Sequence, residues 1–142
     1  MQTLDYGLLP DLLGYQLRRA QVRLFQHFAA TVGERAITPG QLGILVLIQR
    51  NPGLSQSALA RALGVERSTL GEVVERFEKR GLISRQPSPS DRRSLALHLS
   101  PAGEALMAEL TPLVRDHEKR FTAALSPAER EQLVGLLARL AP

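Results

Sequence analysis

The sequence contains no cysteine and no tryptophan, and only two tyrosines and four phenylalanines. Without cysteine, disulfide bonds, thiolate metal sites, cysteine nucleophiles and thiol-based redox sensing are excluded. Six aromatic side chains are too few for the stacking platforms with which proteins hold single-stranded nucleic acid. No run of about 18 apolar residues occurs, as a membrane-spanning helix would need. Residues 1–11 also lack the basic and apolar regions of a signal peptide, so we expect a soluble, cytoplasmic protein.

The charge that is present comes mostly from arginine, which supplies 16 of the 18 basic residues in a chain of 142 residues with a formal net charge of +4. A length of 142 residues fits about one domain, and a hydrophobic share of 44% is ample for a packed core. The positive excess lies in residues 1–100, whereas residues 101–142 contain five basic and six acidic side chains. An arginine-rich first part fits a partner that carries phosphate.

Apolar residues recur at helical spacing in several segments, which are bounded by capping signals. Gly33 is expected to end the first helix, and Thr38 with Gln41 should form a capping box at the start of the second. Residues 126–129 form a second such box, and Pro112 should kink or distort the helix that contains it. The expected helices span residues 8–32, 39–49, 56–63, 67–80 and 100–124, with a last helix from residue 127.

A short hairpin is predicted after the fourth helix. Leu95, Leu97 and Leu99 alternate with smaller or polar residues, which is the period of a strand. Residues 82–86 and 94–99 are the two expected strands, and the turn-rich loop between them is basic. The predicted fold is therefore mainly α with one small β-hairpin.

Residues 56–73 have the features of a helix-turn-helix. Ala60 is small enough to let two helices approach closely, and Gly64 supplies the tight turn between them. Val65, Leu70 and Val73 are expected to pack the second helix on the first, so that its N-terminal turns can enter a major groove. An ordinary antiparallel helix pair is the alternative.

The basic hairpin that follows favours DNA binding. Arg85, Arg92 and Arg93 cluster around its loop. A hairpin directly after a recognition helix makes a winged helix, and an arginine at its tip would be attracted to the negative potential of a narrow minor groove. The alternative for Arg92 and Arg93 is a solvated turn.

Several segments, in order and at matching spacings, resemble the MarR family of winged-helix transcription regulators. The resemblance covers nearly the whole chain and implies that the chain is a single MarR-type domain. It implies a homodimer in which residues 8–33 and 100–142 form the dimerisation helices, while residues 38–99 form the lobe that binds a pseudo-palindromic operator. The matching segments are Leu17-Arg18-Arg19-Ala20, Ile37-Thr38-Pro39, residues 51–60, Arg67-Ser68-Thr69, residues 78–83, Asp91-Arg92-Arg93-Ser94 and Leu99-Ser100-Pro101-Ala102-Gly103.

The resemblance places Arg67, Ser68 and Thr69 at the start of the recognition helix, where they would reach base edges and nearby phosphates. Glu72 departs from the polar or basic residue that relatives often carry about there. Its carboxylate could accept a hydrogen bond from cytosine, or it could pair with Arg76 four residues later, and we favour the pairing.

The remaining DNA contacts are expected on phosphate and in the minor groove. In the family's wing motif, an Asp at position 91 orients the Arg at position 93, which enters the minor groove. Arg76 and Lys79 are candidate phosphate contacts, or simply a solvated helix face. Arg92 is expected to meet phosphate, as are backbone N–H and hydroxyl groups of Ser55, Gln56 and Ser57 at a helix N-terminus.

The resemblance also implies a small anionic or aromatic effector, with the first helix as part of its site. Arginine suits a carboxylate or phosphate, although each arginine could instead form an interface salt bridge or attract the DNA backbone. We expect an organic anion, such as an aromatic acid or its coenzyme A thioester, and no cofactor. The candidate ligand-binding residues are Tyr15, Arg18, Arg19, Arg23, Phe25 and His27.

Metal sensing is not expected, because His27, His98 and His117 lie in separate elements and none belongs to a ligand-spaced pair. His117, between two acidic residues, is expected at the surface. No phosphate loop, nucleophile elbow or paired catalytic acids are present, so we expect no enzyme. The favoured function is a homodimeric repressor released by its ligand; the alternative is a ligand-independent DNA-architectural or protein-interaction module.

Overall fold

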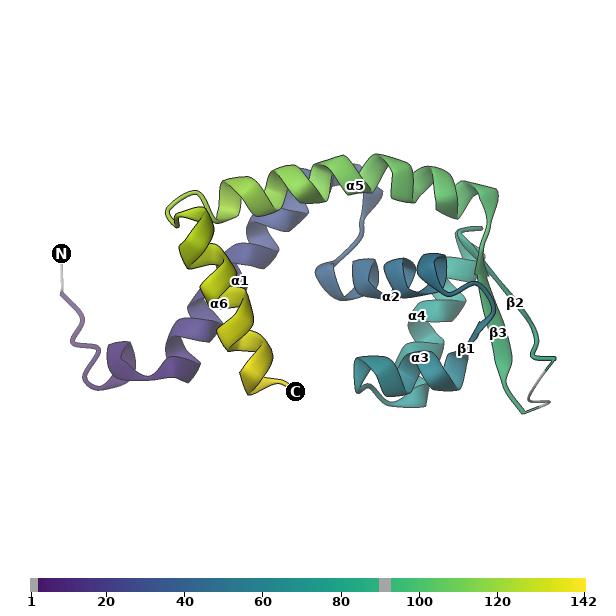
Figure 1. Ribbon diagram of the computed structural model, residues 1–142, viewed down its shortest axis with the longest axis horizontal. Coiled ribbons are helices and arrows are strands. Elements are labelled where there is room, and N and C mark those ends of the chain that lie inside the picture. Colours follow the sequence, from purple (N-terminus) through teal and green to yellow (C-terminus); the bar gives the residue numbers. More distant parts are fainter. Residues whose placement is uncertain (1–2, 90–92) are drawn as a thin grey trace. The chain divides into compact units, whose positions relative to one another are not determined.

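The computed structural model describes residues 3–89 and 93–142. It divides into two compact units (Figure 1), which we call the terminal unit, Met1–Glu34 with Leu113–Pro142, and the central unit, Arg35–Pro112. The boundary falls within the helix α5, Pro101–Phe121, so this one helix contributes to both units. Among the described residues, no helix is both long enough and apolar enough to cross a membrane.

The terminal unit contains α1, Leu13–Val32, the second part of α5, and α6, Pro127–Leu140. The prediction that the first helix begins near Leu8 was wrong by five residues, because Leu9–Asp11 form a separate 3-10 turn and Leu12 is extended. Pro10 lacks an N–H group and is tolerated only in the first turn of a helix, which explains the interruption. Gly33, with φ 55°, ends α1 as expected.

The capping box at the start of α6 is confirmed. The hydroxyl of Ser126 accepts the N–H of Glu129, and the Glu129 carboxylate accepts the N–H of Ser126. Hydrogen bonding of the Glu129 carboxyl to the Ser126 backbone N–H, and then to the Ser126 side chain, lowers the pKa of Glu129. Pro112 does not interrupt α5, which continues as one helix to Phe121.

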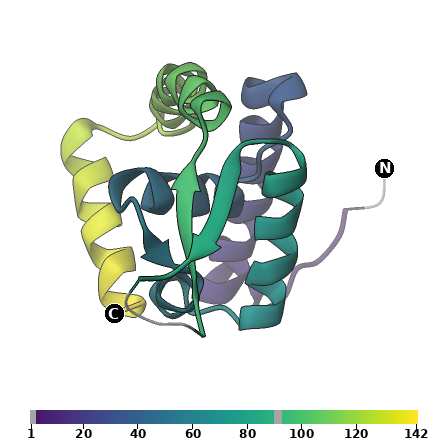
Figure 2. The same ribbon diagram turned by 90° about the vertical axis from the view of Figure 1, so that its right-hand side faces the viewer.

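The central unit contains a small three-stranded antiparallel sheet (Figure 2). Three helices precede or flank the sheet: α2, Pro39–Arg50, α3, Gln56–Leu63, and α4, Arg67–Lys79; a short 3-10 turn, Gly33–Arg35, leads into this unit. The capping box of Thr38 and Gln41 at the start of α2 is confirmed. Gly64, with φ 65° and ψ 31°, makes the left-handed turn between α3 and α4 that the sequence predicted.

The predicted hairpin forms as β2, Ile83–Pro87, and β3, Leu95–Leu99, and we call this hairpin with its loop the wing. A third strand, β1 at Leu54–Ser55, was not predicted. It pairs with β3 on the side away from β2, so the order is β1-β3-β2.

The hydrophobic core of the central unit joins the three helices to the sheet. Val65 is 41% exposed, so the prediction that it packs α4 on α3 was wrong. Leu70 does pack there, together with Val74 and Phe77, one and two turns further along the same face. The most deeply buried side chains of this unit are Leu45, Ile48, Leu59, Leu70, Val74, Phe77, Leu97 and Leu110.

Candidate DNA-binding and ligand-binding sites

The first turn of α3 presents backbone N–H groups that no helix carbonyl can accept. Ser55 precedes the helix, and its hydroxyl oxygen accepts the N–H of Ala58 at 3.0 Å. The N–H groups of Gln56 and Ser57 occupy the positions that lack an intrahelical acceptor. Together with the helix dipole, these groups favour an anion at this end of α3.

The first turn of α4 is presented outward. Arg67, Ser68 and Thr69 are exposed, whereas Leu70 is only 1% exposed and anchors the helix to the core. A helix fixed by one apolar face keeps its polar first turn in a defined position, which is what contact with base edges requires.

Four residues predicted to contact DNA meet around one small hollow. Gln56 and Ser57 reach it from α3, Arg67 from α4 and Arg93 from the wing. Its volume is about 150 Å³, and Ser94 and Leu95 also line it. We call it the basic hollow. Asp91 and Arg92, the other predicted wing residues, lie outside the described residues.

The predicted pairing between the Glu72 and Arg76 side chains is not formed among the described residues. Instead, the Arg76 Nε donates to the backbone carbonyl of Glu72 at 3.4 Å. Lys79 Nζ lies 3.4 Å from the carboxylate of Glu75, four residues earlier. Both cations remain exposed on α4, and an exposed pair of this kind contributes little to stability.

Two arginines that add to the positive charge of this region have structural partners. The guanidinium of Arg85 makes two hydrogen bonds to the Glu78 carboxylate, at 3.0 and 3.1 Å. This pairing lowers the pKa of Glu78 and raises that of Arg85. Arg80 donates to the backbone carbonyls of Arg35 and Ala36. Both side chains therefore tie α4 to neighbouring segments of the central unit.

The predicted ligand-binding residues lie along α1. The guanidinium of Arg19 stands 5.7 Å from the ring centre of Tyr15, within range of a cation–π interaction. Arg18 and Arg23 are exposed, and Phe25 is 46% exposed.

His27, the last residue of this set, has a partner that the sequence did not reveal. Its Nδ1 lies 2.7 Å from the Nδ1 of His117, which is 1% exposed, so the prediction that His117 lies at the surface was wrong. His117 also stacks on Phe121 and meets Phe28 edge-on. Burial is the main cause that lowers the pKa of His117, and the proximity of His27 adds to it.

The spacing of the buried residues in α5 explains the burial of His117. Met107 and Leu110 are buried, and positions seven residues after Leu110 fall on the same helical face. Of the acidic neighbours, Asp116 pairs with Arg120, while the Glu118 carboxylate lies 4.0 Å from His117 Nε2. No group of three or more potential metal ligands occurs within residues 3–89 and 93–142.

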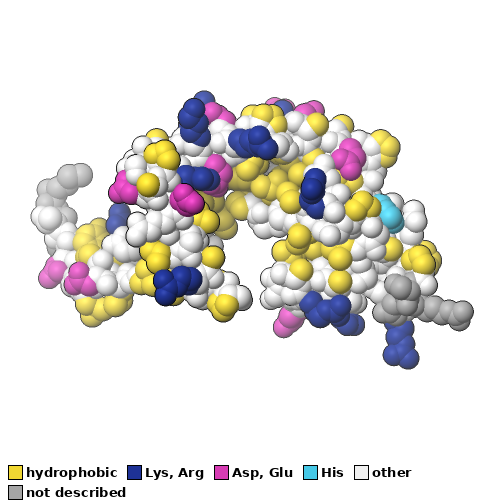
Figure 3. Space-filling view, viewed as in Figure 1, with side chains coloured by type: hydrophobic (Ala, Val, Ile, Leu, Met, Phe, Trp, Pro, Cys, Tyr) yellow, Lys and Arg dark blue, Asp and Glu magenta, His cyan; other side chains and the backbone are white. Residues whose placement is uncertain are grey.

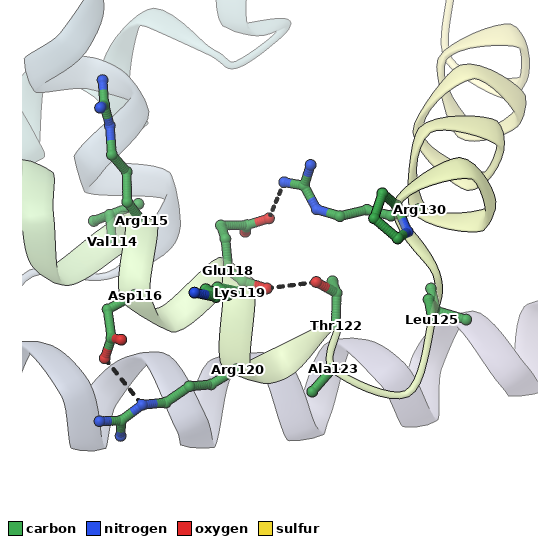
Figure 4. Close-up of a pocket in the computed structure, with 11 residues that line it drawn as sticks. Val114, Arg115, Asp116, Glu118, Lys119, Arg120, Thr122, Ala123, Leu125 and Arg130 are labelled. Atoms are coloured by element: carbon green, nitrogen blue, oxygen red, sulfur yellow. Dashed lines mark hydrogen bonds and ion pairs between the residues drawn. The ribbon is translucent and has the colours of Figure 1, made fainter.

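The terminal unit also contains an open cavity of about 770 Å³ that the sequence did not predict (Figure 4). Glu118 from α5 and Arg130 from α6 point toward one another and form an ion pair at 3.1 Å. Asp116 pairs with Arg120, four residues later, at 3.0 Å. The remaining lining residues are Val114, Arg115, Lys119, Thr122, Ala123, Leu125 and Pro127.

Apolar side chains are exposed along α1 and α6, the first and last α-helices of the chain. Figure 3 shows hydrophobic side chains on one face of the surface. α6 has no buried residue. The exposed apolar residues of α1 and α6 are Leu13, Leu17, Val22, Phe25, Leu133, Val134, Leu136, Leu137 and Leu140.

Two close-packed helices, an exposed polar first turn on the second and a wing directly after it define a winged-helix DNA-binding protein. The model of the MarR family matches residues 37–95. A protein of Thauera aromatica described as a transcriptional regulatory protein for the hcr operon is 46% identical over 141 residues, which cover 99% of this chain and 85% of that protein. The chain belongs to the MarR family and is a transcriptional regulator, not an enzyme, which confirms the resemblance seen in the sequence.

Solved structures of the repressor CouR share the whole fold. CouR bound to a 23-mer DNA duplex is 40% identical, with a TM-score of 0.93 over 99% of this chain and 100% of that chain. CouR bound to p-coumaroyl-CoA is 38% identical, with a TM-score of 0.89 over 98% of both chains. The predicted winged-helix fold is therefore confirmed.

Proposed function

We propose that this chain is a homodimeric, cytoplasmic repressor that binds a pseudo-palindromic operator and leaves it when a small organic anion binds. The observation that carries this proposal is the likeness to CouR over the whole chain, because CouR has been solved with DNA and with an acyl-CoA. The proposed division of labour is that residues 38–99 bind DNA and that residues 8–33 and 100–142 dimerise.

For DNA, we propose that the first turn of α4 meets base edges and that the wing enters the minor groove. The exposure of Arg67, Ser68 and Thr69 supports the first assignment. Arg76 and Lys79, exposed further along α4, would contact phosphate, as would Ser55, Gln56 and Ser57 at the N-terminus of α3. Asp91, Arg92 and Arg93 remain the proposed wing contacts, and Glu72 is free to accept from a base because its carboxylate does not pair with Arg76.

Substitution of the wing arginine tests the DNA-binding proposal. We expect Arg93→Ala to weaken operator binding by about 10- to 100-fold, the usual effect of losing a charged hydrogen-bonding contact, without unfolding the dimer. The measurement is a fluorescence anisotropy titration at fixed salt, with a duplex that the wild-type protein selects from random-sequence DNA. Arg139→Ala, which removes an exposed arginine of α6, is the matched control. Unchanged affinity of Arg93→Ala would contradict the wing assignment.

For the effector, we propose an aromatic acid or its coenzyme A thioester. The support is that CouR was solved with p-coumaroyl-CoA, and that α1 of this chain carries exposed arginines beside Tyr15 and Phe25. The proposed ligand-binding residues are Tyr15, Arg18, Arg19, Arg23, Phe25 and His27.

A ligand titration tests the proposed effector class and its binding residues. We expect p-coumaroyl-CoA, p-coumarate or both to raise the melting temperature, because a ligand that binds only the folded state stabilises it, and to release the selected duplex. Arg19→Ala should reduce both effects, and Arg139→Ala should not. If neither compound shifts the melting temperature or releases DNA, this effector class is wrong and a ligand-independent module is favoured.

A further inference from the structure

We infer that the basic hollow is a seat for one phosphate group of the DNA backbone, held jointly by α3, α4 and the wing, with Ser94 as a phosphate-binding residue. This inference rests on the proposed DNA-binding function and deepens it. The sequence indicated phosphate contact at the N-terminus of α3 and groove contact by the wing as separate events. The hollow joins the two, since Gln56, Ser57, Arg67 and Arg93 all line it.

The size of the hollow limits what it can hold. At about 150 Å³, it lies well below the roughly 300–1,000 Å³ of sites that enclose organic ligands. A phosphate group fits such a space, whereas a whole nucleotide does not. Among the described residues, six line the hollow; none of these six is acidic, and two of them are arginines. The charge of the hollow therefore favours an anion.

The strongest indication of a ligand is the buried hydroxyl of Ser94, which lacks a hydrogen-bond partner in the described part of the chain. Ser94 is only 6% exposed, and its Oγ has no hydrogen-bond partner among the described residues. Buried hydroxyl groups are nearly always hydrogen-bonded, because leaving them unsatisfied costs free energy. A phosphate oxygen in the hollow would accept this O–H, and the hydroxyl would then be satisfied.

A second unsatisfied group lines the same hollow. Gln56 Oε1 is buried and has no partner among the described residues. The amide carries two donors on its nitrogen, and oxygen and nitrogen exchange places when the group turns by half a rotation. In that orientation Gln56 would donate to the phosphate beside the N–H groups of the first turn of α3. The Gln56 amide lies beside Gly71 of α4. A Cβ added to Gly71 would stand 3.5 Å from the Gln56 nitrogen, which is an ordinary van der Waals distance.

The geometry favours a backbone phosphodiester over a free phosphate compound. The hollow opens between the first turn of α4 and the wing, the two elements that we assign to the major and minor grooves. One phosphate gripped there would fix the position of both elements on the duplex at once, which is the usual role of backbone contacts. A phosphate of a free coenzyme A compound is the other source of the same chemistry, and the experiment below separates the two.

The test combines Ser94→Ala with single methylphosphonate substitutions along the backbone of the selected duplex. For the wild-type protein, we expect one methylphosphonate position per half-site to weaken binding by about 10- to 100-fold, the scale of a hydrogen bond to a charged group. Ser94→Ala should lose a similar factor on the unmodified duplex. On the duplex modified at that position, Ser94→Ala and the wild-type protein should bind almost equally, because the two changes remove the same interaction.

Three controls make the result specific. Ser84→Ala removes a hydroxyl from the same hairpin at a position that does not line the hollow, so it should bind like the wild-type protein. Arg67→Ala should likewise lose affinity on the unmodified duplex and bind the duplex modified at that position almost like the wild-type protein, whereas Arg50→Ala, at the exposed end of α2, should bind both duplexes like the wild-type protein. The melting temperature of Ser94→Ala should be unchanged, since its hydroxyl has no hydrogen-bond partner within the described part of the chain; a clear decrease would indicate a structural role and overturn the inference.

Further outcomes decide between the proposals. If Ser94→Ala and the wild-type protein respond identically to every methylphosphonate while binding the duplex well, the phosphate seat is wrong and the DNA-binding function stands. If the wild-type protein selects no duplex, both are wrong. If Ser94→Ala leaves DNA affinity unchanged but reduces the thermal shift that free coenzyme A produces, the hollow serves a free phosphate compound, and the assignment to the DNA backbone is overturned.

Discussion

Gly103 allows the first turn of α5 to pack directly against the backbone at the start of the wing. A Cβ placed on Gly103 would lie 2.1 Å from the backbone oxygen of Leu82, which already accepts the N–H of Ser100. The Ser100 hydroxyl donates a hydrogen bond to the Gly81 carbonyl and accepts one from the N–H of Gly103. The first turn of α5 is therefore held against the backbone at the start of β2, with no space for a methyl group.

We expect Gly103→Ala to lower the free energy of unfolding by roughly 2–3 kcal/mol, because the obstructing atom is backbone and cannot rotate away. Chemical denaturation followed by circular dichroism measures this. Gly40→Ala in α2, where an added Cβ meets nothing within 4 Å, is the matched control and should be neutral or slightly stabilising. Equal stability of Gly103→Ala and the wild-type protein would show that α5 can shift away from β2.

At the scale of elements, α1 and α5 are joined inside the terminal unit by the pair His27 and His117. Burial and the neighbouring His27 lower the pKa of His117, and the nearby carboxylate of Glu118 opposes this only in part. Between the lowered pKa and the value of about 6.5 in the unfolded chain, the unfolded chain binds more protons than the folded protein. Stability therefore rises with pH across this window, and it falls as pH drops below about 6.5.

His117→Phe should remove this contribution while keeping the aromatic contacts with Phe28 and Phe121. We expect the difference in the free energy of unfolding between the wild-type protein and the variant to depend on pH from about 6.5 downward and to be constant above it. Urea denaturation at fixed protein concentration between pH 5 and 8 measures the difference. Parallel pH profiles for the two proteins would contradict the assignment.

Local sequence signals predicted most elements because the physics behind them is local. Capping boxes at Thr38 and Ser126 and the left-handed turn at Gly64 depend on a few adjacent residues, and all three are confirmed. β1 was missed since two residues show no period, and its formation depends on pairing with β3 about 40 residues later. The same limit applies to sites: the basic hollow requires three separate elements to meet, which no spacing along the chain reveals.

At the scale of the whole molecule, α6 is a helix of 14 residues without a single buried residue. An isolated helix of this length is marginal in water, so its stability must come from packing an apolar face against something. Leu133, Leu136 and Leu137 are 37–47% exposed and fall on neighbouring turns. Because MarR-family regulators act as dimers, we expect a second copy of the chain to cover this face.

We expect Leu137→Asp to raise the dimer dissociation constant by at least about 100-fold, because an unpaired charge at the centre of a buried interface is strongly unfavourable. Sedimentation velocity over a range of protein concentrations measures this. Gln132→Asp introduces the same charge at a polar position of α6 and should remain dimeric. Operator affinity should fall with dimerisation, since a monomer engages only one half-site and loses the gain in effective concentration that links the two. If Leu137→Asp stays dimeric but loses operator binding, the face of α6 serves some purpose other than dimerisation, and the second copy must be held by other residues.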